Sequence, residues 1–335
     1  MPGASTATLN ALLSAYLIKK VLEKKQATAL YDRFAQPYTL PVNQGDTAKF
    51  FLYENMPQMT GVCDEGVLPP PGSAVRTEKT VSVDQYIWWL PFTDRLQTLD
   101  MDSQVIQRLQ TKLSQMATLS IDTIKGTTYT AGANVVYGGN VASRVLTESV
   151  PILTDFKLIQ KTLKGNIAAH VTQRIAPTDK VGTLPIREAF IGIFHTDAEP
   201  HFDNIQGFKH ASEYPSNDAL PNEYGSIGEI RIFTTQNAIV IPNAGTANAA
   251  ALGMESDNGT NCNVYLGIVF GMDALGTVGL QAHNMEAIIK DVTSGGAENA
   301  GNQKGSVALK TYDAELILDE DYIVRYEHTC EVAPS

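Results

Sequence analysis

Two extended, apolar-rich stretches, residues 47–53 and 77–92, flank a long connection and lead almost directly into one long helical pattern. The connection, residues 54–76, is rich in glycine and proline and is far longer than the loop of an ordinary hairpin. A projecting two-stranded arm cannot cover its own apolar faces in water, so it requires a neighbouring protein surface. The pattern therefore predicts a subunit that assembles with other subunits.

The helical pattern covers residues 101–125, with a cap at Asp100 or Asp102 and an end at Gly126. Its apolar residues recur at steps of three, four or multiples of these, which places them on one face of the helix. They are Met101, Val105, Leu109, Leu113, Met116 and Ile124. At about 1.5 Å per residue such a helix spans roughly 37 Å. A helix of this length indicates a strut that supports other elements.

The composition excludes several classes of protein. Of the 335 residues, 43% are hydrophobic, which allows a sizeable core, and only 18% are charged, below the roughly 25% of typical globular domains. The net charge of −11 argues against sequence-independent binding to nucleic acid, which requires a basic face. The 3 cysteines are odd in number and far apart, which favours a reducing compartment over a disulfide framework or a zinc site. No stretch is apolar enough to span a bilayer, and the apolar run at 9–18 lacks the basic leader of a secretory signal.

The rest of the chain has the periodicities of both helices and strands, so we expect an α+β fold. Residues 9–21 and 154–164 have the spacing of amphipathic helices, and residues 200–209 favour a short helix. Strands are predicted at 189–194, 229–234, 238–241, 264–270, 287–292, 307–318 and 322–328. Prolines and glycines are expected to interrupt regular structure or to form tight turns, at Pro37, Pro41, 225–228, Gly271 and Gly276.

One cluster contains residue types that bind metals: His195, Asp197, His201 and Asp203. Metal binding requires these side chains to converge, and the spacing of the two histidines does not place them on one helical face. A loop between a strand and a helix, with polar groups that cap the helix, is the interpretation that the pattern favours. The chain contains no nucleophile elbow, zinc-binding helix motif or phosphate-binding glycine loop. We therefore expect no enzymatic activity, metal or cofactor, and the alternative is a metal-dependent hydrolase that uses the His195–His201 cluster.

Several short motifs follow one another along the chain. In the first hundred residues they are 45–50, 65–67 with Pro70, 81–86 and the pair Thr93-Asp94. Further along they are 132–137, 190–197, 224–234 and 270–276. In this order the motifs resemble the major capsid proteins of tailed bacteriophages, over about residues 30–330, and the resemblance is closest to podovirus-like coliphages. Encapsulins and the floors of herpesvirus capsids share this fold.

The resemblance implies an α+β fold in four parts: an N-terminal arm, an extended loop, a peripheral domain with a long spine helix, and an axial domain. Carried over by position, the arm is 1–45, the loop 46–92, the peripheral domain 93–183 with 281–335, its spine helix 101–125, and the axial domain 184–280. It implies self-assembly into hexamers and pentamers that build an icosahedral shell around packaged double-stranded DNA. The protein would then belong to the virion and assemble in the host cytoplasm, without a membrane.

The resemblance also implies partners, namely a separate scaffolding protein, a portal and decoration proteins, while DNA is enclosed without sequence-specific binding. From its place on the predicted arm we expect contact between subunits at Phe51, Tyr53, Arg76, Lys79 and Trp88. An encapsulin-type shell protein, which encloses an enzyme cargo, is an alternative with the same fold. A surface adhesin is disfavoured because no export signal is visible.

Overall fold

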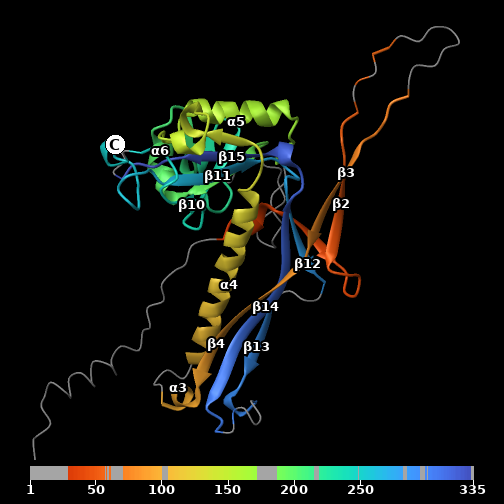
Figure 1. Ribbon diagram of the computed structural model, residues 1–335, viewed down its shortest axis with the longest axis vertical. Helices are drawn as coiled ribbons and strands as arrows, with labels where there is room; N and C mark the ends of the chain where they lie inside the picture. The colour runs from red at the N-terminus through yellow and green to blue at the C-terminus, as the bar shows by residue number, and fades with distance from the viewer. Residues whose placement is uncertain are drawn as a thin grey trace, which may run out of the picture.

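The structure is a computed structural model, and it describes residues 29–56, 58, 60–61, 71–99, 105–171, 187–214, 219–247, 249–281, 285–294, 299 and 301–332. The helix expected at 9–21 and the middle of the connection 54–76 lie outside these residues. The described chain forms two sheets, one long helix and a projecting hairpin (Figure 1). None of its helices is long and apolar enough to cross a membrane.

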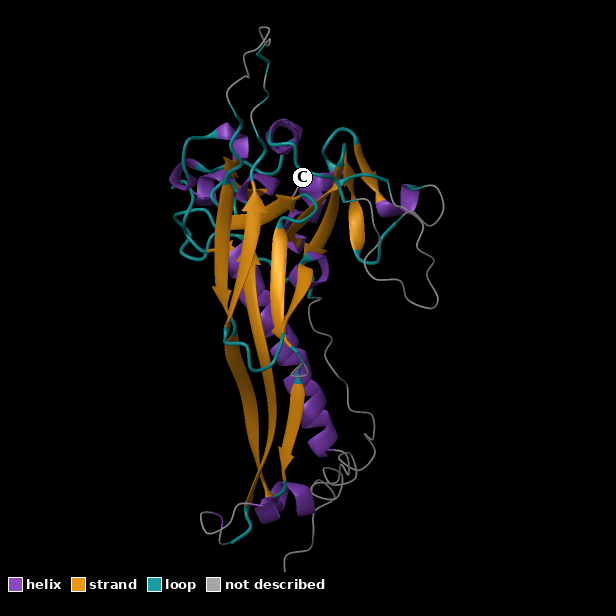
Figure 2. Cartoon of the chain, turned by 90° about the vertical axis from the view of Figure 1, so that its right-hand side faces the viewer, coloured by secondary structure: helices purple, strands orange, loops and turns teal. Residues whose placement is uncertain are grey.

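The long helix, α4 (Val105–Tyr129), runs along a five-stranded sheet, as Figure 2 shows from the side. The sheet has the order β1 (Gln36–Leu40), β12 (Leu275–Leu280), β14 (Lys304–Ile317) and β13 (Glu286–Lys290), and β4 (Asp84–Thr93) pairs with the other side of β14. Leu113 and Ala117 of α4 pack on Val307 and Leu309 of β14. The predicted end of the helix at Gly126 is wrong, because α4 continues to Tyr129.

β14 organises this sheet because it is long enough to pair with three strands. One of its edges carries β4 in an antiparallel register from Lys304↔Thr93 to Asp313↔Asp84. Its other edge carries β13 and then β12, one after the other. Two strands of this sheet were missed from the sequence, β1 and β12. In the other sheet the short strands at 135–137 and 208–210 were missed, and the tight turn expected at 225–228 is wrong, because 223–227 form a strand. β1 contains Pro37, which an edge strand tolerates because no neighbour needs its missing N–H, and β12 contains glycines that were interpreted as turns.

The second sheet has eight strands and is covered on both faces. Its order is β5 (Val135–Tyr137), β15 (Ile323–His328), β11 (Val264–Phe270), β6 (Phe190–His195), β9 (Ile230–Thr235), β8 (Glu223–Ile227) and β7 (Phe208–His210), with β10 (Val240–Ile241) on β11. One core cluster joins one face of the sheet to α5 (Leu153–Gly165) and α6 (Glu199–Asp203). Another joins the opposite face to α2 (Tyr31–Phe34) and the end of α4. Burial on both faces explains why β11 is apolar throughout. The remaining short helices are α3 (Asp94–Leu99) and α7 (Ala249–Leu252).

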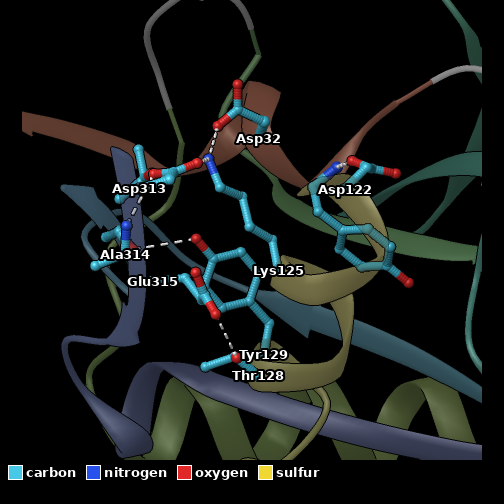
Figure 3. Close-up of polar contacts among 11 residues, drawn as sticks. Asp32, Asp122, Lys125, Thr128, Tyr129, Asp313, Ala314 and Glu315 are labelled. Carbon is cyan, nitrogen blue, oxygen red and sulfur yellow. Dashed lines mark hydrogen bonds and ion pairs between the residues drawn. The ribbon is translucent and has the colours of Figure 1, made fainter. Parts of the chain in front are cut away.

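A buried polar junction around Lys125 of α4 joins α2, α4 and β14 of the five-stranded sheet (Figure 3). The Lys125 Nζ atom lies 2.8 Å from Asp313 Oδ2 of β14 and also binds Asp32 of α2, and the lysine side chain is 3% exposed. Burial by itself lowers the pKa of Lys125, but the two carboxylates outweigh this effect and raise it. The backbone N–H of Tyr31 donates to Asp122 Oδ1 at 2.8 Å, so α2 is fixed to α4 at a second point. The junction therefore ties the start of the described chain to the strut.

Candidate assembly surfaces

The projecting hairpin consists of β2 (Thr47–Tyr53) and β3 (Arg76–Ser82), which pair antiparallel from Thr47↔Ser82 to Tyr53↔Arg76. It forms a sheet of its own and points away from the rest of the molecule (Figure 1). The prediction that 77–92 is a single strand of this arm is wrong. The chain divides at Val83, and β4 leaves the hairpin to pair with β14 over its whole length.

The two faces of the hairpin differ in what covers them. Phe50 and Val81 lie on the inward face, where they pack against Val278 of β12 and Leu316 of β14. Residues on the outward face alternate with these and are exposed along both strands. Alternation in a two-stranded sheet thus half-buries one face against the same chain and leaves the other uncovered among the described residues.

The outward face presents aromatic rings beside charged groups. Phe51 is 51% exposed and Tyr53 is 68% exposed. The Arg76 guanidinium lies 4.4 Å from the centre of the Phe51 ring, and Lys49 Nζ lies 2.6 Å from Glu78 Oε1. The hydrogen bond from Lys49 lowers the pKa of Glu78. Exposed tyrosine and arginine are the residue types that dominate binding energy at protein interfaces.

The structure separates the five residues expected to contact other subunits. Phe51, Tyr53 and Arg76 lie together on the outward face of the hairpin. Lys79 lies on the inward face, opposite Phe50, and its Nζ atom is 3.9 Å from Glu320 of the same chain. Trp88 lies on β4 and packs against the core cluster under α4. That any of the five contacts another subunit stays a prediction.

A second exposed apolar surface was missed from the sequence. We call it the outer sheet face: it lies on the side of the five-stranded sheet opposite α4 and is formed by Ile87, Trp89 and Ile288. Trp89 is 61% exposed, whereas its neighbour Trp88 packs inward. The alternation of a strand requires that one of two adjacent tryptophans faces outward. The sequence does not say which one, because that depends on the pairing with β14.

The candidate metal cluster does not converge on one point. His195 Nδ1 lies 3.1 Å from Asp197 Oδ2, which also accepts from the Tyr265 hydroxyl. His201 Nε2 accepts from the backbone N–H of Glu331 instead, at 3.2 Å. Asp203 accepts from the Tyr224 hydroxyl at 2.9 Å. Within the described ranges no three His, Cys, Asp or Glu side chains are arranged to hold a metal ion, so the hydrolase alternative has no support here.

The strongly shifted titratable groups near this cluster belong to the core. His328 at the end of β15 is completely buried, stacks on Tyr265 at 5.9 Å between ring centres, and lies beside Cys330. Burial lowers the pKa of His328 to about 4. Burial also raises the pKa of the Cys330 thiol, which opposes formation of a reactive thiolate. These shifts are those of groups enclosed by protein rather than of an exposed reactive site.

Known proteins were compared with the chain by sequence and by structure. No protein-family model and no curated protein sequence matches it. Solved structures of phage capsids match it over nearly its full length. The capsid of Ralstonia phage GP4 matches with a TM-score of 0.66 at 12% identity, covering 94% of this chain and 94% of that one.

Two further capsids agree with this match. The acid-stable capsid of Helicobacter pylori bacteriophage KHP30 has a TM-score of 0.62 at 9% identity, with 98% of this chain and 99% of that one covered. The capsid of cyanophage P-SCSP1u has a TM-score of 0.61 at 13% identity, with 95% and 92% covered. Identities this low establish the fold alone. The chain has the mixed helix-and-sheet fold of phage capsid proteins, which confirms the predicted fold class, while the closer resemblance to podovirus-like coliphages stays a prediction.

Proposed function

We propose that this protein is the major capsid protein of a tailed bacteriophage, a non-enzymatic subunit that assembles into an icosahedral shell around packaged double-stranded DNA. The observation that carries the proposal is the outward face of the β2–β3 hairpin. It presents Phe51, Tyr53 and Arg76 to the surroundings on an element that projects from its own chain. An exposed, ordered aromatic surface on an extended arm is useful to a protein that covers it with a neighbour. The full-length likeness to phage capsid structures supports the same proposal.

The parts of the fold receive roles under this proposal. The β2–β3 hairpin is the assembling portion of the extended loop 46–92, and α4 is the spine helix of a peripheral domain formed by 93–183 and 281–335. Residues 184–280, which supply most of the eight-stranded sheet, are the axial domain, and residues 1–45 are the N-terminal arm. Identical copies form hexamers and pentamers. A scaffolding protein, a portal and decoration proteins complete the virion, which is assembled in the host cytoplasm.

The stability of such a shell comes from repetition of modest contacts. An arm that buries on the order of 1,500 Å² against its neighbours makes an interface of standard size. Closure of each ring then makes every contact depend on the others. A net charge of −11 suits an interior that must not bind phosphates tightly, because the genome has to be packed and later released.

Electron microscopy of the purified protein tests the proposal, first with the parent chain and then with a variant of the outward face. We expect closed shells or capsomer rings from the parent. We expect the variant Phe51→Ser/Tyr53→Ser/Arg76→Ser to fold, as judged by circular dichroism and urea unfolding, and to yield at least tenfold fewer particles. Val145→Ser, which removes another exposed apolar side chain far from the hairpin in sequence, is the matched control and should assemble as the parent does.

Two outcomes would contradict the proposal. A parent chain that stays monomeric under all assembly conditions would contradict the proposed shell function. Normal particles from the triple variant would contradict the proposed role of the hairpin in assembly. Nuclease-protected DNA in particles from infected cells would favour a phage head over an encapsulin-type shell, which would contain protein cargo instead.

A further inference from the structure

The strand β13 lies at an edge of the five-stranded sheet. It pairs antiparallel with β14 from Glu286↔Lys310 to Lys290↔Ser306, and no described strand pairs with its other side. Figure 1 shows it beside β14, on the side away from β4. An edge strand presents a row of backbone N–H and C=O groups that another strand can bind.

The two free edges of this part of the sheet are built differently. β4, at the opposite edge, contains Pro91, which has no N–H to offer to a further strand. β13 contains neither proline nor glycine, and its centre is Ala287, Ile288 and Ile289. Ile288 is 38% exposed and Ile289 is 51% exposed. An apolar, unblocked edge is the kind that natural proteins normally protect, so a specific partner strand is expected there.

The sequence of β13 is complementary to itself. If a second β13 runs antiparallel to the first about a two-fold axis at Ile288, Glu286 of each strand lies opposite Lys290 of the other. The same pairing places Ala287 opposite Ile289. Opposite charges across an antiparallel pair are favourable and like charges are unfavourable. A parallel pairing in the same register would instead place Glu286 against Glu286 and Lys290 against Lys290.

The side chains of such a pair also match by face. Ile288 shares a face with Ala308 of β14 and Trp89 of β4, because paired residues of neighbouring strands point to the same side. A two-fold axis perpendicular to the sheet keeps Ile288 of both copies on that side. The outer sheet face, formed by Ile87, Trp89 and Ile288, would then continue across the axis into the same surface of the second copy. Ile288 of one copy would then lie directly opposite Ile288 of the other at the axis, without any change in the fold of the subunit.

We propose that β13 pairs with β13 of a second copy of this chain across a two-fold axis, antiparallel and centred on Ile288, so that the two five-stranded sheets become one continuous sheet. The inference rests on the proposed function, since the partner is another subunit of the same shell. A ladder of five residues on each side is a small interface, so it acts through repetition over many subunits rather than as a strong isolated dimer.

A charge exchange tests the pairing. Glu286→Lys alone and Lys290→Glu alone each place like charges opposite each other twice at every axis, and each should raise the critical concentration for assembly at least threefold. The double variant Glu286→Lys/Lys290→Glu restores opposite charges and should return to within about twofold of the parent. A double variant as defective as the worse single variant would overturn the proposal. The urea unfolding of each unassembled variant checks that the subunit itself is unchanged.

Disulfide cross-linking tests the geometry independently. Directly opposed residues of antiparallel strands have Cα atoms about 4.5–5.5 Å apart, within the range that a disulfide spans. In a Cys63→Ser background, where the described cysteines Cys262 and Cys330 are buried, Ile288→Cys should give a covalent dimer when assembled particles are oxidised. Ile87→Cys, at a more exposed position (55% against 38% for Ile288) on β4 at the opposite edge, is the control and should give at least fivefold less dimer.

The outcomes separate this proposal from the proposed function. Particles that form normally but give no more dimer from Ile288→Cys than from Ile87→Cys overturn the β13 contact and leave the shell function intact. A parent chain that never assembles overturns both. A dimer that forms in assembled particles and disappears when the particles are dissociated before oxidation supports the contact.

Discussion

The β2–β3 hairpin and the eight-stranded sheet are both made of β-strands, yet they are completed in different ways. All seven residues of β11 are buried, because the same chain covers both faces of that sheet. No residue of β2 or β3 is fully buried, and their outward face has no cover among the described residues. The difference indicates that the eight-stranded sheet contributes more to the stability of the single subunit than the hairpin does. The outward face of the hairpin contributes its energy only after assembly.

The largest effect on the free energy of unfolding is expected when an aromatic ring is removed from the eight-stranded sheet, and the same change in the hairpin provides the comparison. Phe194→Ala deletes a ring that is 0% exposed and packs against Phe156, Phe202 and Tyr326, so it should lower the free energy of unfolding by about 3–5 kcal/mol. Phe51→Ala should lower it by less than about 1 kcal/mol, because that ring is half exposed and contacts mainly Arg76. Urea unfolding of the unassembled protein measures both.

Particle yield should show the reverse order when the two proteins are compared under conditions where both are folded. Phe51→Ala should reduce assembly more than Phe194→Ala does. Equal unfolding free energies for the two variants would break the comparison, because the hairpin would then be part of the core that stabilises the subunit.

The same contrast explains what the sequence could predict. The strands β6, β11 and β15 were predicted within one residue at each end. β6 and β11 were predicted from their apolar runs, and β15 from alternation, although the structure buries five of its six residues. β1 and β12 were missed because Pro37 and the glycines of β12 are poor strand formers that tertiary pairing accommodates.

Only some of the residues expected on the arm lie there, because the sequence shows local patterns but not which strands pair. Phe51, Tyr53 and Arg76 were placed on an arm correctly, since the arm pattern is local in sequence. Trp88 was misplaced because periodicity shows that side chains alternate but not which sheet a strand joins. The spacing of His195 and His201 likewise does not show in which direction each side chain points, and in the structure the two side chains contact different partners.

The next largest effect is a dependence on pH that arises at His328, in the eight-stranded sheet. The pKa of His328 is about 4 in the folded protein and 6.5 when the residue is free of its surroundings. Between these values the unfolded chain binds a proton that the native protein does not, so stability is lost as the pH falls from 6.5 towards 4. Because the pKa falls from 6.5 to about 4, and one pKa unit corresponds to about 1.4 kcal/mol, the full loss is about 3 kcal/mol.

Urea unfolding of the parent and of His328→Phe across this pH range isolates the effect. The phenylalanine keeps the aromatic stack on Tyr265 and does not titrate, so the difference between the two proteins should shrink or reverse as the pH falls. His210→Gln, at an exposed histidine, is the control and should leave the pH dependence as in the parent. Identical slopes for the parent and His328→Phe would show that the histidine is hydrated in the native state.

A smaller effect is expected from two lysines, one at the junction and one on the hairpin. Lys125→Met leaves the carboxylates of Asp313 and Asp32 without their buried ammonium and should cost about 2 kcal/mol. This value is below the usual cost for a buried pair because Asp32 is 57% exposed and can be hydrated. Lys49→Met breaks an exposed pair with Glu78 and should leave the urea midpoint unchanged.

A second substitution checks the cause of the Lys125 effect. Asp313→Asn in the Lys125→Met background removes one uncompensated charge and should recover part of the lost stability. No recovery would mean that the lysine acts through the packing of its methylene groups. If Lys49→Met destabilised the protein as much as Lys125→Met does, the exposed ion pair of the hairpin would contribute as much to the free energy of unfolding as the buried junction, which would contradict the comparison.

The smallest effect on stability is expected from alanine substitutions at two glycines. One glycine is required by packing against a neighbouring ring and the other by its backbone conformation. A Cβ at Gly126 would lie 2.8 Å from Cε2 of the buried Tyr31 ring, whereas a Cβ at Gly45, before the hairpin, would meet nothing within 4 Å. In α4 an alanine gains about 1 kcal/mol of helix propensity, but a clash in a packed core costs about 1–3 kcal/mol, so Gly126→Ala should destabilise by about 1 kcal/mol. Gly45→Ala should cost about as much through its positive φ of 92° alone.

The background variant Tyr31→Ala distinguishes the two causes. Removal of the ring frees the space beside α4, so Gly126→Ala should become stabilising in that background, while the cost of Gly45→Ala should stay the same. A double-mutant cycle measured by urea unfolding gives the coupling directly, because only contacting residues are expected to interact. If Gly126→Ala remained destabilising without the ring, the glycine would be required by the helix itself. The packing of α2 against the strut would then not be the reason that a glycine occupies the last turn of α4.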